Sequence, residues 1–302
     1  MTRQSDLGTL RRRNDALIFQ LALRFTNSIL PALYSAFALA VSHTFWWHSS
    51  TPEVYTLFTF LLASSLIFFD RYERDNKLTD LIISAFFFGL SASDHILAFL
   101  ICRNSYISTS KNRSDLNLVQ CALHRLPREA LQLISFQFHP PDEKFSRQTD
   151  QQTALLNTFL SGLGAVSLLV IGGSVLKYFL FLALQFGPVG IVLGASGFRS
   201  AMRNDDQSVR KIVACFIVYA LFGIFYRVAD QFAFFLTSYI FFAILMGLGL
   251  NGLFSTLREK ARFTLTVSLL LLILLTPPFY RLVPSLAESG GADDASIGIP
   301  PK

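Results

Sequence analysis

Long apolar stretches without charge, separated by short basic segments, restrict most strongly what this sequence can fold into. Ile212–Phe225 and Gln231–Phe254 contain no charged residue, and the basic residues Arg258, Lys260 and Arg262 follow soon after them. A membrane crossing needs about 20 mostly apolar residues, and a backbone in lipid satisfies its own hydrogen bonds as a helix. The sequence therefore predicts an all-α fold, a polytopic bundle of transmembrane helices.

About eight crossings are expected. They are placed at Ile29–Phe45, Val54–Phe69, Leu78–Cys102, Leu155–Leu176, Phe179–Gly197, Ile212–Phe225, Gln231–Phe254 and Phe263–Tyr280. The expected domains are a basic cytoplasmic or interfacial N-terminus (1–27), a transmembrane helical domain (28–284, with a polar loop and interfacial helix at 103–153) and a disordered tail (285–302). If successive crossings alternate in direction from a cytoplasmic N-terminus, the basic loop Arg199–Lys211 falls on the outer side of the membrane. Basic loops, however, usually lie on the cytoplasmic side. One crossing before Gly197 is therefore expected to be misplaced or missing.

The composition agrees with a membrane protein and excludes other classes. Of the 302 residues, 52% are hydrophobic and 15% are charged, against about 25% charged residues in a typical soluble domain. The net charge of +6 comes from basic residues between the apolar stretches. Membrane lipid is therefore an expected partner and nucleic acid is not. The three cysteines are too scattered for a disulfide framework or a zinc site, so no metal ligands are predicted.

An ionisable pair, Asp94 and His95, interrupts the apolar stretch Leu78–Cys102. Ionisable residues within a membrane segment are costly, and they often mark a functional site. Two interpretations remain open: the pair contacts a substrate, or it forms a hydrogen bond that only holds two helices together.

Two segments around this pair resemble a known family. Thr44-Phe-Trp-Trp47 with Pro52-Glu-Val-Tyr-Thr-Leu57, followed by Gly89-Leu-Ser-Ala-Ser-Asp-His95, resembles a motif of the protein-O-mannosyltransferase-like membrane glycosyltransferases of the GT-C type. Many bacterial members of this family are known only as a domain of unknown function. Asp94 stands where the family more often has Asn.

A second block also resembles this family. Phe186–Gly190 opens an expected crossing, and Tyr226–Asp230 resembles the family's Tyr-x-x-x-Asp break. Phe234–Leu236 and Gly247–Gly249 then resemble its glycine-rich helix. The two blocks occur in the family's order and cover about half of the chain.

The resemblance implies a GT-C-like bundle in a bacterial cell membrane. It implies transfer of a sugar from a polyprenyl-phosphate donor to a protein or glycan acceptor on the non-cytoplasmic side. Such a transfer needs a carboxylate that takes the proton of the acceptor hydroxyl, and cationic groups or a divalent metal cofactor that hold the leaving phosphate. No catalytic residue is assigned, and the predicted substrate-binding residues are Trp47, Glu53, Tyr55, Asp94, His95, Tyr226, Arg227 and Asp230.

Several of these residues have a structural interpretation as well. Glu53 either orients a sugar hydroxyl beside the tryptophans or merely complements the dipole at a helix start. Arg227 and Asp230 either line an external cleft or form a structural ion pair.

One departure from the family concerns activity. Family members begin with a crossing and an external loop that carries an acidic residue, thought to be the catalytic base, and a His-Pro-Pro-Gly-like turn. No counterpart precedes Thr44, so the chain is expected to lack that loop and to be truncated or inactive unless the loop is supplied. Two other functions are therefore considered: a transporter or flippase of a lipid-linked sugar, with Asp94 and His95 as a proton relay, and a non-catalytic membrane partner.

Overall fold

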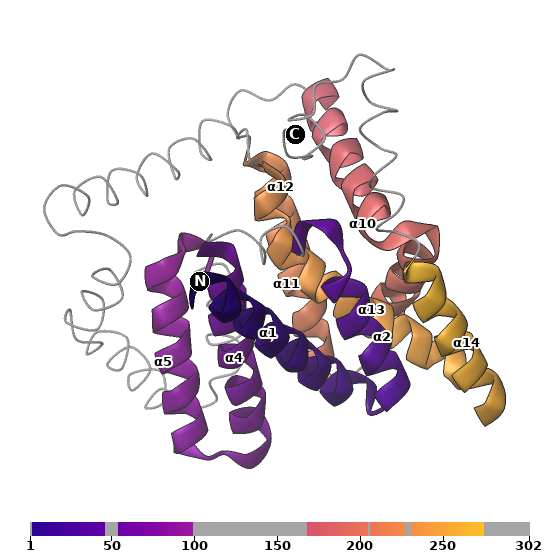
Figure 1. Ribbon diagram of the computed structural model, residues 1–302, viewed down its shortest axis with the longest axis horizontal. Helices are drawn as coiled ribbons and strands as arrows, with labels where there is room; N and C mark the ends of the chain where they lie inside the picture. Colours follow the sequence, from indigo (N-terminus) through magenta and orange to yellow (C-terminus); the bar gives the residue numbers. More distant parts are fainter. Residues whose placement is uncertain (1, 46–53, 99–167, 205, 227–230, 275–302) are drawn as a thin grey trace, which may run out of the picture. The chain divides into compact units, whose positions relative to one another are not determined.

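The computed structural model describes residues 2–45, 54–98, 168–204, 206–226 and 231–274 (Figure 1). All regular elements in these ranges are helical, which confirms the all-α prediction. They are α1 (Thr2–Thr26), α2 (Ile29–Ala40), α4 (Val54–Asp75), α5 (Leu78–Asp94), the short 3-10 helix η1 (Ile96–Ala98), α10 (Leu168–Arg203), α11 (Gln207–Phe225), α12 (Gln231–Phe234), α13 (Leu236–Phe254) and α14 (Glu259–Ile273).

Three of the described helices are long and apolar enough to cross a membrane. They are Gly172–Arg203 within α10, Gln207–Phe225 and Leu236–Phe254. Two shorter apolar helices occupy Ile29–Ala40 and Leu78–Ala92. These helices indicate an integral membrane protein, whereas the predicted number of eight crossings is not shown.

The chain divides into two compact units. The first comprises Met1–Thr56 and Leu168–Lys302, and the second comprises Leu57–Ser167. The first unit is built around α13, which packs against α1, α2, α10 and α11 (Figure 1). Nearly every residue of α13 is buried, from Leu236 through Leu250 without interruption. A helix that is apolar on all sides belongs in the interior of a bundle, so the composition of α13 explains its central place.

Helices α10 and α13 cross at unusually short range. A Cβ atom added to Gly197 would overlap the carbonyl oxygen of Leu245, and one added to Gly249 would overlap the carbonyl oxygen of Leu193. Each glycine thus lies against the backbone of the other helix, as small residues do where membrane helices approach closely.

The sequence placed a boundary between two crossings near Lys177 and Tyr178, and this boundary is wrong. Helix α10 continues through both residues and is broken instead at Gly187, whose φ of 68° lies in the left-handed region. The Lys177 ammonium lies over the Phe181 ring at 5.6 Å, and the long stem of lysine tolerates apolar surroundings. Glycine accepts a positive φ and the following Pro188 lacks an amide hydrogen, so the helix breaks there.

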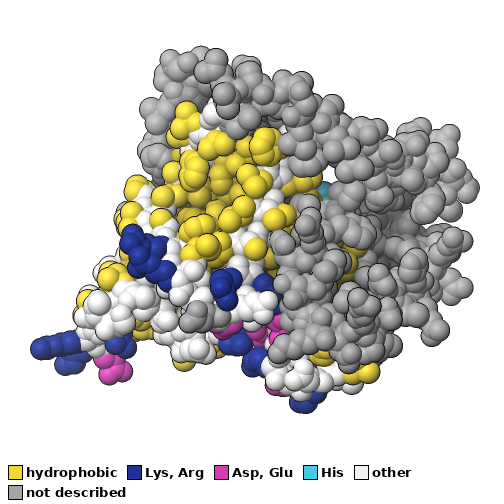
Figure 2. Space-filling model, turned by 180° about the vertical axis from the view of Figure 1, so that it is seen from behind, with side chains coloured by type: hydrophobic (Ala, Val, Ile, Leu, Met, Phe, Trp, Pro, Cys, Tyr) yellow, Lys and Arg dark blue, Asp and Glu magenta, His cyan; other side chains and the backbone are white. Residues whose placement is uncertain are grey.

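Large apolar side chains are exposed along the outside of the first unit. They include Leu176, Phe179, Leu180 and Val192 of α10 and Phe263, Val267, Leu271 and Leu272 of α14. Figure 2 shows a broad area of apolar side chains with Lys and Arg along one side of it. Apolar areas of this kind mark surfaces that contact lipid or protein, in agreement with a membrane protein.

The described part of the second unit is a helical hairpin of α4 and α5. The hydroxyl of Ser65 donates to the carbonyl oxygen of Ser84 at 3.0 Å, and the hydroxyl of Ser84 donates to the carbonyl oxygen of Ser65 at 2.8 Å. The Phe68 and Phe87 rings stack beside them with centroids 5.9 Å apart. These reciprocal contacts hold the two helices in register.

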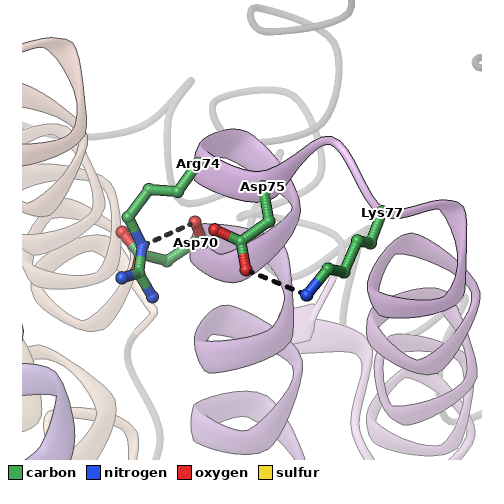
Figure 3. Close-up of polar contacts among 4 residues, drawn as sticks. All are labelled: Asp70, Arg74, Asp75 and Lys77. Atoms are coloured by element: carbon green, nitrogen blue, oxygen red, sulfur yellow. Dashed lines mark hydrogen bonds and ion pairs between the residues drawn. The ribbon is translucent and has the colours of Figure 1, made fainter.

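The hairpin turns through a short charged connection. Asn76 has a φ of 51° between the two helices, a left-handed conformation that Asn adopts more readily than most residues. Arg74 pairs with Asp70 at 3.2 Å, and Lys77 pairs with Asp75 at 3.6 Å (Figure 3). The structure thus has a turn between the expected crossings Val54–Phe69 and Leu78–Cys102.

The close crossing of α10 and α13 predicts that alanine lowers the stability of the protein at one glycine of α13 and leaves it unchanged at another. Gly249→Ala is expected to cost about 1–3 kcal/mol, because the methyl group is forced against the α10 backbone. The control is Gly252→Ala, since nothing lies within 4 Å of a Cβ atom at Gly252. Thermal unfolding of the detergent-solubilised protein measures both, and equal midpoints would contradict the crossing.

Candidate functional site

The structure describes four of the eight predicted substrate-binding residues. Tyr55 and Tyr226 belong to the first unit, and Asp94 and His95 belong to the second. The other four, namely Trp47, Glu53, Arg227 and Asp230, lie outside the described residues.

Tyr55 and Tyr226 meet on one aromatic ring, that of Phe234. The Tyr55 and Phe234 rings are edge-to-face with centroids 5.8 Å apart, and the Tyr226 and Phe234 rings are edge-to-face at 4.6 Å. Phe222 stacks on Tyr226 at 5.2 Å. The two predicted residues, far apart in the sequence, therefore belong to one aromatic cluster, formed by Tyr55, Phe222, Tyr226 and Phe234.

The cluster has a clear origin in the local structure. Tyr226 follows α11, and its backbone amide donates to the carbonyl oxygen of Phe222. The Tyr226 side chain is only 3% exposed, so its ring contributes to packing between α11 and α12. Phe234 was not predicted as a site residue. The sequence did contain an indication that Phe234 belongs to the site, because Phe234-Phe235-Leu236 is part of the segment that resembles the family.

Asp94 and His95 lie where α5 ends. Asp94 is the last helical residue, and His95 has an extended backbone with φ −150° and ψ 133°. The His95 amide still donates to the carbonyl oxygen of Ser91 at 2.9 Å. Helix α5 thus ends at Asp94, inside the crossing expected at Leu78–Cys102, while Gly89 lies within the helix.

The hydrogen bonds of His95 determine which of its ring nitrogens can donate. The backbone amide of Leu97 donates to Nδ1 of His95 at 3.2 Å. A neutral imidazole whose Nδ1 accepts a hydrogen bond carries its hydrogen on Nε2. The ring also lies against Phe58, with centroids 5.3 Å apart. His95 is therefore oriented by backbone and aromatic contacts so that Nε2 is the donor.

Two oxygen atoms near His95 are buried without a hydrogen bond. In the part of the chain that the structure describes, these are Oδ2 of Asp94 and Oγ of Ser91. Ser91 is 0% exposed and precedes Asp94 by one helical turn. A buried polar atom without a partner costs about 1–3 kcal/mol, and such atoms in native proteins call for a specific role. Ser91 is a candidate site residue that the sequence prediction did not include.

The described ranges bear on the divalent metal that the family resemblance allows. They contain no group of three or more His, Cys, Asp and Glu side chains that could hold an ion. Asp94 and His95 together would supply two ligands at most, so the divalent metal allowed by the family resemblance stays a prediction.

Comparison with protein families finds a match in the N-terminal part of the chain. Residues 14–114 match the family model of the protein O-mannosyl-transferase TMEM260 N-terminal domain, TMEM260_N. This segment is similar to that family. The family resemblance inferred from the sequence motifs is thus confirmed for a third of the chain. Comparison with the curated proteins and with the solved structures finds no match.

The TMEM260_N segment contains five of the predicted site residues, namely Trp47, Glu53, Tyr55, Asp94 and His95. Tyr226, Arg227 and Asp230 lie beyond it. In the first unit, the TMEM260_N segment contributes α1 from Asn14 onward and α2, which pack against each other and against α13. The remainder of the chain therefore supplies part of the scaffold on which this segment is folded.

Asn14, at the start of the TMEM260_N segment, is a further residue that the sequence prediction missed. Its side-chain Nδ2 donates to the carbonyl oxygen of Thr56 at 2.9 Å, and the side chain is 1% exposed. Thr56 follows Tyr55 in the Glu-Val-Tyr-Thr-Leu motif. The signal was present in the sequence, because Asn14, Ile18 and Ala22 repeat every four residues and so lie on the apolar face of α1.

This hydrogen bond predicts a stability effect at Asn14. Asn14→Leu removes the donor to the Thr56 carbonyl and is expected to cost about 1–3 kcal/mol. Gln20→Leu on the exposed side of the same helix is the control. The measurement is the thermal unfolding midpoint in detergent. A midpoint of Asn14→Leu equal to that of the control would show that the bond contributes nothing.

Proposed function

We propose that this protein transfers a sugar from a polyprenyl-phosphate donor to a protein or glycan acceptor on the non-cytoplasmic side of a membrane. The observation that carries the proposal is the TMEM260_N match at residues 14–114, since that family is described as a protein O-mannosyl-transferase domain. The three long apolar helices support a membrane location, as a polyprenyl-linked donor requires.

Such a transfer requires a group that accepts a proton and groups that stabilise the leaving phosphate. The acceptor oxygen forms a bond to C1 of the sugar, while the bond from C1 to the phosphate oxygen breaks and the phosphate leaves with the electron pair. The proton of the acceptor hydroxyl passes to a carboxylate. Hydrogen-bond donors and cations stabilise the charge that develops on the phosphate.

We assign His95 to the donor phosphate. Its Nδ1 accepts from Leu97, so Nε2–H is the group that can donate to a phosphate oxygen. Ser91 offers a hydroxyl one turn away, and Asp94 offers a carboxylate that can accept from a sugar hydroxyl. Glu53 and Arg227, which lie outside the described residues, stay predicted substrate-binding residues.

Substitutions of His95 test this assignment through the KM of the donor. His95→Phe keeps a ring against Phe58 but removes the donor, and is expected to raise the KM about tenfold, the equivalent of about 1.4 kcal/mol. His95→Gln keeps an N–H near the position of Nε2 and is expected to stay within about threefold of wild type. The assay follows labelled sugar from a polyprenyl-phosphate donor into a peptide acceptor with purified protein in nanodiscs.

Substitutions of Asp94 and Glu53, with a third carboxylate as control, supply the matched comparison. Asp94→Ala and Glu53→Ala are expected to lower transfer by about 10²-fold or more, as for groups that contact the reacting sugar. Asp80→Ala, in the first turn of α5, is the control and should retain wild-type activity. If the wild type transfers no sugar but moves a lipid-linked sugar in a way that depends on a proton gradient, the transferase proposal is rejected in favour of a transporter. Absence of both, with a second subunit that co-purifies, would indicate a non-catalytic partner.

A further inference from the structure

One lysine interrupts the apolar sequence of the candidate membrane span in α10. Between Gly172 and Phe198, Lys177 is the only charged residue, and it is the sixth residue of the 32-residue span Gly172–Arg203. A charged side chain within a membrane segment is costly and calls for a specific role. Because Lys177 lies near the beginning of the span rather than at its middle, its long side chain can reach the headgroup region of a bilayer.

The charge of Lys177 is held in place but is not balanced by a carboxylate. The ammonium lies over the Phe181 ring at 5.6 Å, a contact that attracts the cation and leaves its positive charge in place. Lys177 has no carboxylate partner among the residues that the structure describes. Its side chain is half-buried, so an anion can still approach the ammonium from outside.

The helix around Lys177 is fixed against the core of the first unit. The Phe181 ring is buried and lies 6.1 Å from the Phe235 ring. Tyr178, the residue after Lys177, donates its hydroxyl to the Ser238 hydroxyl oxygen on α13 at 3.0 Å. These contacts give Lys177 a defined place at the boundary between the buried and the outer face of α10.

The outer face of α10 beside Lys177 is apolar and open. Leu176, Phe179 and Leu180 are 61%, 54% and 56% exposed. Leu176 and Leu180 are one turn apart and therefore lie on the same side of the helix. In a protein that crosses a membrane, exposed apolar side chains of this kind contact lipid. A cation at the edge of such a surface is complementary to a molecule that carries a phosphate at the end of hydrocarbon chains.

We propose that Lys177 binds the phosphate group of an anionic phospholipid whose hydrocarbon chains lie on Leu176, Phe179 and Leu180. The ammonium supplies both a positive charge and N–H donors for the phosphate oxygens. A zwitterionic phospholipid carries its own cation beside the phosphate, so the site prefers the anionic kind. All of these residues belong to the first unit, and the proposal does not depend on the transfer of a sugar.

A photoactivatable phosphatidylglycerol, with the reactive group in its acyl chain, tests this site. The full-length protein is reconstituted into phosphatidylcholine nanodiscs that contain the probe, and mass spectrometry of peptides locates the adducts after illumination. Lys177→Gln is expected to lower the labelling of residues 176–180 about fivefold, as for the loss of one lysine at a lipid surface. Lys177→Arg keeps the charge and should be labelled as the wild type is.

Helix α14 supplies the internal control. Phe263 and Leu271 are also exposed apolar side chains of the first unit, and their labelling should be the same in Lys177→Gln and in the wild type. If Lys177→Gln does not fold, competition on the wild type gives the decision. Unlabelled phosphatidylglycerol should then displace the probe from residues 176–180, and added phosphatidylcholine should not.

Three results would overturn the proposal. Unchanged labelling of residues 176–180 in Lys177→Gln would leave Lys177 with only its structural contact to Phe181. An equal fall in the labelling of α14 would show a general loss of lipid contact instead of a loss of one site. Displacement of the probe by inorganic phosphate as effectively as by phosphatidylglycerol would show that the ligand is a free anion. Sugar transfer by the wild type, or its absence, bears on the proposed function alone.

Discussion

The arrangement of the first unit depends on one constraint: α13 is apolar on every side and must be covered on every side. In a membrane, helices associate through close packing more than through the hydrophobic effect. Gly197 and Gly249 allow the α10 and α13 backbones to touch, and Phe186 then packs against aromatic residues of α13. The positions of α10 and of the residues on it follow from this contact.

Neutral amides make the buried long-range contacts around Thr44 and Thr56. A buried ion pair must overcome a large desolvation cost, whereas an amide side chain can donate and accept without charge. Gln185 uses both ends of its amide on Thr44, and Asn14 uses its donor on Thr56. Such contacts join residues of different helices at little electrostatic cost, which suits an apolar bundle.

The sequence predicted most reliably what depends on local composition. The end of α11 at Phe225 and the end of α13 at Phe254 agree with the predicted apolar stretches. The end of α5 at Asp94, inside the crossing expected at Leu78–Cys102, was not predicted, although the ionisable pair there marked an unusual position. The boundary placed at Lys177 was wrong, since a lysine can remain in a helix by extending its stem, while Gly187 and Pro188 carried the stronger breaking signal.

What local composition could not predict are pairings between distant residues. Nothing near Gln185 in the sequence indicates that it caps a helical turn 141 positions earlier, and nothing near Tyr55 indicates that it meets Tyr226 on the Phe234 ring. These contacts arise only after α10, α11 and α12 have packed around α13. Ionisable residues inside an apolar stretch are costly and often mark a functional site, so Asp94 and His95 stay predicted site residues.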